Sequence, residues 1–374
     1  MTVGADVLVI GAGIVGAACA DELAARGLRV LVIESGTVGG GATAAGMGHL
    51  VAMDDNPAEL ALTRYSLELW RRFVADAPRR HEYSQCGTIW VAADDEELAA
   101  ARAKQTLLGD AGVACELLDA AALAACEPRL RPGLAGGLRV GGDAVVYPPK
   151  SAQILLDRAC ARGAGLLRER VRGLTQHGVT LDNGARIDAG MVVVANGVGA
   201  AALLPELPLR PKKGHLMITD RYPGFVRHQL VELGYIKSAH AASGESVAFN
   251  VQPRPTGQLL IGSSRQFDND DRDVDPRLLR RMLARAADYL PGLAQLHALR
   301  CWTGLRAASA DGLPLIGPHP ARRNVWLATG HEGLGITTSL ATAQLLAAQL
   351  CGSAAPIAAA PYLPARFAQL AAHG

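Results

Sequence analysis

The sequence lacks several patterns that would indicate particular classes of protein. Its seven cysteines include no Cys-x-x-Cys pair, which argues against a disulfide scaffold and a zinc or iron–sulfur site and favours free thiols in a reducing compartment. Acidic and basic residues are interspersed to a net charge of +2, without the basic block that would indicate nucleic-acid binding. No apolar run reaches about 18 residues, so we expect no membrane span.

The first residues also lack a positively charged leader before an apolar stretch, which is the pattern of a secretory signal. We therefore expect a cytoplasmic protein, with peripheral attachment to the inner membrane left open. What the sequence does contain is 374 residues, 49% of them hydrophobic. That is enough for a sizeable core in two domains or in one large, elaborated domain.

The first 34 residues carry the clearest motif. An apolar run at residues 5–10 predicts a buried parallel strand, and Gly11, Gly13 and Gly16 follow it in G-x-G-x-x-G spacing. A helical pattern then leads to a second apolar run, which ends at Glu34. In a dinucleotide site such glycines allow a tight turn, backbone contact with pyrophosphate and close helix packing, and the acid accepts hydrogen bonds from ribose. This order of elements predicts a Rossmann-type dinucleotide site.

The motif alone does not distinguish FAD from NAD, but the residues after it do. A single NAD domain would continue with alternating strands and helices. This chain instead enters a loop rich in glycine and alanine at residues 39–49, followed by a long amphipathic helix at about residues 57–75. Small residues in the loop suit a backbone that passes close to an extended cofactor. A flexible surface loop is the alternative.

Two later segments repeat the pattern of an apolar strand followed by small residues. Residues 191–197 do so after a hairpin pattern at residues 179–188, which implies a strand that returns to the first sheet and a discontinuous cofactor domain. Residues 325–337 do so before an apolar helix from about Thr337 to Leu350. The N-terminus of that helix would place positive partial charge near the ligand, where it would favour a reduced flavin.

Taken together, the motifs resemble those of the D-amino-acid oxidase/glycine oxidase superfamily of FAD enzymes. The matching pieces are Gly11 to Gly16 with Glu34, Ala42 to Met47, Trp302 to Arg306, Asp311 to Gly317, Gly330-His331 and Pro361 to Phe367. Within the superfamily, the chain looks most similar to bacterial D-hydroxyproline dehydrogenases and to related subunits of opine oxidases and cyanide synthases. That narrower likeness rests on residues 232–240, 252–262 and 330–335.

The resemblance implies an α/β and α+β fold with two domains. A discontinuous Rossmann-type FAD-binding domain would comprise residues 1–79, 146–205 and 300–374. A substrate domain with a large mixed β-sheet would comprise residues 80–145 and 206–299.

The resemblance also implies which residues bind the cofactor. Cys301 lies near the position where some relatives attach flavin covalently, but its spacing to Asp311 differs, so we expect non-covalent FAD. No metal is expected. The residues expected to bind FAD are Gly11, Gly13, Ile14, Gly16, Glu34, Ser35, Ala42, Thr43, Ala45, Gly46, Met47, Val171, Ala195, Gly197, Gly304, Gly330, His331, Gly333, Leu334, Gly335, Ile336 and Thr337.

Flavin-dependent amine oxidation moves a hydride from the substrate Cα to flavin N5, and the protein positions the substrate and excludes water. The planar fork of an arginine matches a carboxylate, and the resemblance assigns this clamp to Arg306. Tyr235 is a candidate hydroxyl donor, with a packed tyrosine as the alternative. His331 is expected beside the flavin, where a structural role is more common than that of a base. His49 and Arg265 are candidates for the pocket wall.

Two departures from the family pattern bear on function. Residues 259–262 contain no cation where some sarcosine-oxidising relatives carry a lysine that promotes reaction with oxygen, which favours a dehydrogenase with another electron acceptor. Small residues stand near Gly333, where glycine oxidases carry an arginine, which argues against glycine as substrate. We therefore expect an FAD-dependent dehydrogenase that acts on the CH–NH or CH–NH2 group of a small D-imino or D-amino acid, such as cis-4-hydroxy-D-proline or D-proline.

The alternatives are an oxygen-using oxidase of D-amino acids, sarcosine or glycine, and a flavin subunit of a complex like an opine oxidase or cyanide synthase. An NAD-dependent dehydrogenase and a subunit that only relays electrons are more distant rivals. Partner subunits and a homo-oligomer are both compatible with the resemblance.

Overall fold

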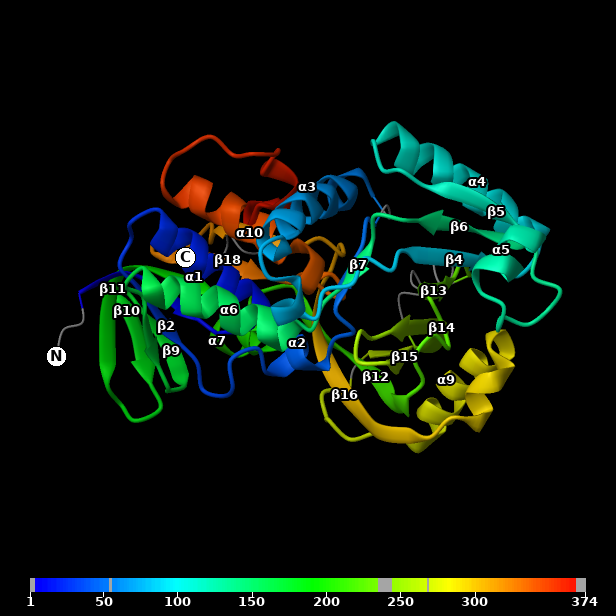
Figure 1. Ribbon diagram of the computed structural model, residues 1–374. Coiled ribbons are helices and arrows are strands. Elements are labelled where there is room, and N and C mark those ends of the chain that lie inside the picture. The colour runs from blue at the N-terminus through cyan, green and yellow to red at the C-terminus, as the bar shows by residue number, and fades with distance from the viewer. Residues whose placement is uncertain (1–3, 54–55, 235–243, 268, 368–374) are drawn as a thin grey trace.

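The computed structural model describes residues 4–53, 56–234, 244–267 and 269–367. Two eight-stranded sheets form the framework of this part of the chain. In Figure 1 the first sheet and its helices lie on the left and the second sheet on the right. A small antiparallel pair, β3 (His49–Leu50) and β7 (Ala144–Val145), forms a third sheet.

The first sheet is the predicted dinucleotide-binding sheet. Its path is β17 (Leu315–Pro318), β18 (Val325–Thr329), β11 (Arg186–Val194), β1 (Ala5–Ile10), β2 (Val30–Ile33) and β8 (Gly165–Leu167). A hairpin of β9 (Val171–Thr175) and β10 (Gly178–Leu181) extends from β11. Because β11 pairs in parallel with β1, the expected strand that returns from late in the chain is confirmed.

Both faces of β1 are buried, which is why its sequence is continuously apolar. Val7 and Val9 belong to the large core on one face, and Leu8 and Ile10 belong to a smaller core on the other. The helices on the first face are α1 (Ile14–Ala25), α3 (Pro57–Val74), α6 (Pro148–Ala161) and α10 (Gly335–Leu350). Helix α1 packs between α6 and α10, and α10 also packs against α3. Helix α7 (Ala200–Leu203) contributes to the smaller core.

The order of the second sheet is β16 (Ala298–Ser309), β12 (Leu209–Arg221), β15 (Gln258–Phe267), β14 (Glu245–Pro253), β13 (Gln229–Glu232), β4 (Thr88–Ala92), β6 (Gly136–Val140) and β5 (Glu116–Asp119). The sheet is mixed, because β13 pairs in parallel with β4 while the other neighbouring strands pair antiparallel. Helix α9 (Pro276–Tyr289) packs on β14 and β15, whereas α4 (Asp95–Asp110) and α5 (Ala120–Cys126) pack beside β4, β5 and β6.

Two details differ from the sequence-based expectations. The segment at residues 39–49, expected to be a loop, contains the short helix α2 (Gly41–Ala45), because its alanines favour helix once the turn is formed. The proposed domain boundary between residues 299 and 300 lies inside β16, which pairs with β12 over its length. Five 3₁₀ turns complete the described elements, at Pro78–His81, Gly197–Gly199, Pro291–Gln295, Ala360–Tyr362 and Pro364–Arg366. Within the described ranges, no helix combines the length and apolarity that a bilayer span requires.

Candidate active site

A cavity of about 870 Å³ runs along the carboxyl ends of β1 and β2 and reaches the second sheet. Most residues predicted to bind FAD line it. They are Gly11, Gly13, Ile14, Glu34, Ser35, Ala42, Thr43, Ala45, Gly46, Met47, Val171, Ala195, Gly197, Gly304, Gly330, His331, Gly333, Gly335 and Ile336. Among the catalytic candidates, His49 and Arg306 also line the cavity. Tyr235 lies outside the described residues.

Four predicted residues are not on the cavity wall. Gly16 lies behind the cavity wall. A Cβ at Gly16 would stand 2.0 Å from the Gly11 carbonyl oxygen, so this glycine allows α1 to pack closely against the turn. Leu334 caps the start of α10. Thr337 lies inside the first turn of that helix, and its hydroxyl donates to the His49 carbonyl at 2.8 Å. Arg265 is buried on β15, two residues after Ser263 of the cavity wall, and pairs with Ser246 of β14.

The glycine turn after β1 has the geometry that a dinucleotide needs. Gly11 has a φ of +100°, and a Cβ there would stand 2.9 Å from the Ala195 carbonyl oxygen. At Gly13 a Cβ would meet the Thr43 hydroxyl at 3.2 Å, on the side that faces the cavity. That hydroxyl accepts a hydrogen bond from the Ile14 backbone N–H at 3.0 Å. Because Gly13 carries no side chain on the cavity wall, a phosphate can approach the N-terminus of α1 there.

The Glu34 carboxylate is held in place at the end of β2. One oxygen accepts the Ala12 N–H at 2.7 Å and the other accepts the Gly36 N–H at 2.6 Å. Each carboxylate oxygen has a further lone pair, so the group can still accept hydrogen bonds from ribose hydroxyls. Its negative charge would repel a 2′-phosphate.

Helix α2 connects the dinucleotide region to the second sheet. At Gly304 of β16 a Cβ would stand 2.5 Å from the Cβ of Ala45, so β16 can approach α2 only because residue 304 is glycine. Trp302 reinforces the contact, because its indole N–H donates to the Ala45 carbonyl at 3.3 Å. The residues from Ala45 to His49 thereby form the wall between the two sheets.

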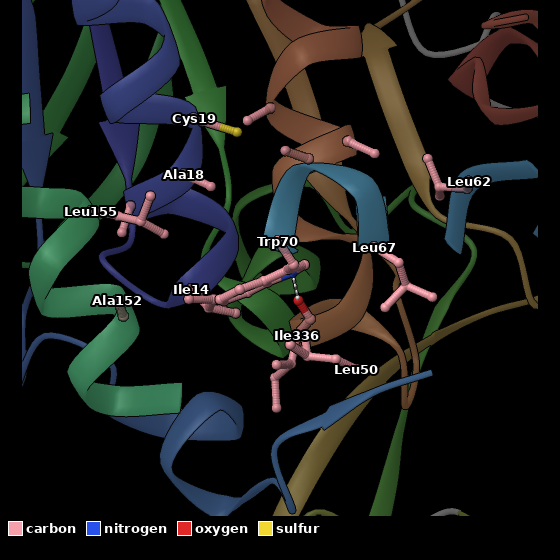
Figure 2. Packing of buried hydrophobic residues seen from close by; sticks show 14 of the residues in the cluster. Ile14, Ala18, Cys19, Leu50, Leu62, Leu67, Trp70, Ala152, Leu155 and Ile336 are labelled. Atoms are coloured by element: carbon pink, nitrogen blue, oxygen red, sulfur yellow. Dashed lines mark hydrogen bonds between the residues drawn. The ribbon is translucent and has the colours of Figure 1, made fainter. Parts of the chain in front are cut away.

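The N-terminus of α10 reaches the same cavity through Gly335 and Ile336. The Trp70 indole of α3 holds this first turn, with its N–H 3.1 Å from the Ile336 carbonyl and 3.0 Å from the Thr337 carbonyl. Figure 2 shows the Trp70 ring lying between α1 and α10 with this hydrogen bond drawn. The positive end of the helix dipole is therefore directed towards the cavity, as the sequence predicted.

Burial disfavours the protonated form of both histidines of the cavity. Burial lowers the pKa of His331 to about 4, and its Nε2 lies 3.0 Å from the Thr342 hydroxyl of α10. This contact gives His331 a structural partner away from the cavity. Burial also lowers the pKa of His49 to about 4, against an opposing contribution from a hydrogen bond with Gln252. The Nε2 atom of His49 is buried and has no hydrogen-bond partner in the described part of the chain.

Arg306 extends from β16 over the neighbouring strand. A Cβ at Gly214 of β12 would stand 2.7 Å from its Nη2 and 3.0 Å from its Cζ, so the guanidinium occupies the space that this glycine leaves. The Nη1 atom lies 3.4 Å from the Ser264 carbonyl of β15. The side chain is thus directed along the face of the second sheet, where a planar cation can bind a carboxylate.

An ion pair between a buried lysine and a half-buried glutamate lies beside Arg306 and was missed by sequence reasoning. Lys212, its register partner on β12, lies 2.5 Å from the Glu332 carboxylate. Burial opposes ionisation of Glu332, but the cations Lys212 and Arg306 hold its pKa below the usual value. Glu332 has a φ of +46°, and its N–H donates to the Ala307 carbonyl at 2.9 Å. A non-glycine residue in this conformation is a signal of a constrained site, although it is visible only in the structure.

The cavity wall also includes residues from both sides that sequence reasoning missed. On the second sheet they include Gly214, Leu216, Asn250, Ser263 and Thr303, and Arg272 lies between β15 and α9. On the side of the first sheet they include Glu169, Arg170, Arg172 and Asn196. Asn250 is only 6% exposed, and its side-chain oxygen has no hydrogen-bond partner among the described residues. Asn196 next to the glycine turn has a similarly unpartnered oxygen. Unpartnered polar atoms on the wall of a large cavity indicate a bound ligand. The Asn196 oxygen lies beside the glycine turn and, together with that turn and Glu34, fits FAD, whereas the Asn250 oxygen belongs to the second sheet.

Comparison with known proteins agrees with this geometry. Residues 6–349 match the family model DAO, described as FAD dependent oxidoreductase. The chain is 30% identical to a glycine oxidase of Pseudomonas aeruginosa, over 96% of this chain and 98% of the relative. It is 28% identical to a D-amino acid dehydrogenase of Methylobacterium nodulans, over 83% and 74% of the two chains. The crystal structure of glycine oxidase from Geobacillus kaustophilus superposes with a TM-score of 0.87 at 29% identity, covering 97% of this chain and 99% of that one.

Proposed function

Because this chain belongs to the DAO family of FAD-dependent oxidoreductases, we propose that it is a dehydrogenase that oxidises the C–N bond of a small D-imino or D-amino acid. The substrates to test first are cis-4-hydroxy-D-proline and D-proline. The observation that carries the proposal is the position of Arg306, whose guanidinium lies on the wall of the same cavity as the glycine turn and Glu34. The relatives named glycine oxidase and D-amino acid dehydrogenase support an amino-acid substrate.

The residues that would hold FAD come from three segments of the first sheet. The glycine turn and Glu34 would bind the pyrophosphate and ribose, while α2 and the N-terminus of α10 would contact the flavin end. Bound flavin supplies the hydride acceptor. Cys301 is absent from the cavity wall and packs against the apolar core on the other side of the second sheet, which supports non-covalent binding.

The chain's own residues would bind and orient the substrate. Arg306 would pair with the carboxylate through two parallel hydrogen bonds and so fix the orientation of the substrate Cα. Lys212 lies next to this clamp, but its charge is compensated by Glu332. A neutral His49 would add a polar group without adding positive charge, because its pKa is about 4.

The proposal includes an electron acceptor other than oxygen. Residues 259–262 of β15 carry no cation. Lys212 lies on the adjacent strand β12 and is paired with Glu332, so neither strand segment would present a free positive charge to reduced flavin. Partner subunits or a homo-oligomer would then pass the electrons on. We also propose a cytoplasmic location, supported by seven cysteines of which none forms a disulfide.

One observation favours a second function, an oxygen-using oxidase. The glycine oxidase of P. aeruginosa and the superposed glycine oxidase structure each align with almost the whole chain. Hydrogen peroxide formed in a one-to-one ratio to oxidised substrate would support the oxidase. Turnover with an artificial dye, accompanied by little peroxide in air, would support the dehydrogenase.

The test of the proposed function is the visible spectrum of the purified holoenzyme under anaerobic conditions. Flavin bands that bleach on addition of cis-4-hydroxy-D-proline or D-proline, and recover slowly in air, are the expected result. Arg306→Ala should retain the flavin bands but bleach only at much higher substrate concentration. Bands that do not change with either imino acid, but bleach with sarcosine, an opine or another D-amino acid, would overturn the proposed substrate.

A further inference from the structure

We infer that Asn250 binds a hydrogen-bond donor of the substrate, either its amine or a ring hydroxyl, at a point away from the carboxylate. The inference rests on the proposed function, because that function places the carboxylate on Arg306. It assigns substrate discrimination to a residue of β14, a strand of the second sheet.

The side chain of Asn250 is built into the cavity wall but is incompletely satisfied. It is 6% exposed and lines the cavity, and its Oδ1 has no hydrogen-bond partner among the described residues. A buried amide oxygen without a partner is costly, and native structures keep few of them. An acceptor that remains unpartnered at a cavity wall is therefore available for a donor on the ligand.

The strand order places Asn250 at a suitable distance from the clamp. The Arg306 guanidinium extends over Gly214 of β12 and lies 3.4 Å from the Ser264 carbonyl of β15. Asn250 pairs with Gly262, two residues before Ser264 on the same β15. One strand spacing of about 4.8 Å and two residues of about 3.3 Å each place the Asn250 backbone about 8 Å from the Ser264 backbone, beside which the guanidinium lies. A small amino acid with its carboxylate on Arg306 can span this distance.

The surface next to Asn250 is apolar. At Gly262 a Cβ would stand 2.8 Å from Leu216 Cδ2 and 3.3 Å from Met47 Sδ, so these side chains fill the space beside its register partner. Met47 and Leu216 belong to the same small apolar cluster. Apolar neighbours reduce competition from water, so a hydrogen bond from the substrate to Asn250 would be selective.

A structural role for Asn250 predicts a different result on substitution. Leucine has nearly the same shape as asparagine but no polar atoms. If the amide serves the folded state, Asn250→Leu should lower the melting temperature. If the amide oxygen serves a ligand, removing an unsatisfied buried acceptor should leave the melting temperature equal or higher.

The experiment measures anaerobic flavin reduction and kcat/KM for the wild-type holoenzyme, Asn250→Leu and Asn250→Ser with D-proline and cis-4-hydroxy-D-proline. Asn324→Leu is the control, because Asn324 also has a buried unpartnered side-chain atom but does not line the cavity. We expect Asn250→Leu to lower kcat/KM by about 10- to 100-fold, Asn250→Ser to recover part of the loss, and Asn324→Leu to leave it unchanged.

The two substrates identify the donor. An equal loss with both would place the substrate amine on Asn250, and a loss confined to the hydroxylated substrate would place the hydroxyl there. Unchanged kcat/KM with both in Asn250→Leu would overturn the inference while leaving the proposed function intact. If neither compound reduces wild-type flavin, the proposed function fails. The melting temperature then decides the inference, which a lower value in Asn250→Leu overturns and an equal or higher value supports.

Discussion

Gly214→Ala should disturb the substrate clamp by displacing the side chain of Arg306. The new Cβ would stand 2.7 Å from Arg306 Nη2, 3.0 Å from its Cζ and 3.1 Å from the Ser264 carbonyl oxygen. Unstrained contacts between such atoms need about 3.5 Å, so the guanidinium must move by about 0.8 Å. The Ser264 carbonyl belongs to the backbone of β15 and has less freedom to yield. The arginine side chain therefore absorbs most of the displacement.

The expected cost follows from this movement. A shifted fork would keep one of its two charge-assisted hydrogen bonds to the carboxylate and lose the other, at about 1.5–3 kcal/mol. This corresponds to a decrease in kcat/KM of about 10- to 150-fold. The FAD content should be unchanged, because Gly214 lies on β12 of the second sheet, away from the glycine turn and Glu34.

The assay is steady-state kcat/KM with an artificial electron acceptor, together with the ratio of flavin to protein absorbance. Gly173→Ala is the matched control, since a Cβ at that strand glycine meets no atom within 4 Å. Combining Gly214→Ala with Arg306→Ala should produce no further loss beyond Arg306→Ala alone, because the glycine acts through the arginine. The same fold loss in both backgrounds, or a single variant within twofold of wild type, would refute the reasoning.

Three further predictions concern the clamp, the cofactor and a buried acid. Arg306→Ala should raise KM and lower kcat/KM by about 100-fold or more, and a nearly unchanged kcat/KM would exclude the clamp. Glu34→Ala removes the acceptor of the Ala12 and Gly36 N–H groups, so purified protein should contain less FAD per chain; full occupancy and unchanged FAD affinity would contradict this role. Burial raises the pKa of Asp143 from a usual value of 3.8 to about 7. Between these two values the carboxyl group is therefore protonated in the folded state but ionised in the unfolded state. Stability contributed by protonated Asp143 is therefore lost as pH rises from about 4 to about 7, and Asp143→Asn should gain melting temperature relative to wild type over that window. Parallel pH profiles for the two proteins would show that Asp143 does not titrate in this way.

Much of the dinucleotide half could be predicted because its signals are local. Gly11, Gly13 and Gly16 lie in a single strand–turn–helix unit, where their spacing can be read from consecutive residues, and Glu34 follows the next strand of the same unit. The return of β11 was also predictable, because a long apolar strand after a hairpin has few other places to pair. The resemblance to a known family added Arg306, which short-range patterns alone do not distinguish from a structural arginine.

The second sheet was harder to predict because its strands are far apart in sequence and their registers are not local properties. Asn250 and Gly214 lie on β14 and β12, and the pairing of both with β15 brings them near Arg306. A shift of one residue in any of these strands would turn the side chains to the other face. Sequence reasoning accordingly missed both residues.

The amino-acid sequence by itself therefore determined the cofactor class, because glycine spacing, strand hydrophobicity and a terminal acid are properties of consecutive residues. Only the tertiary structure decided the composition of the substrate wall. Its ion pair between Lys212 and Glu332, the space above Gly214 and the unpartnered oxygen of Asn250 each depend on contacts between segments distant in the chain. Such contacts are set by strand register and packing, which act only when the whole core has formed.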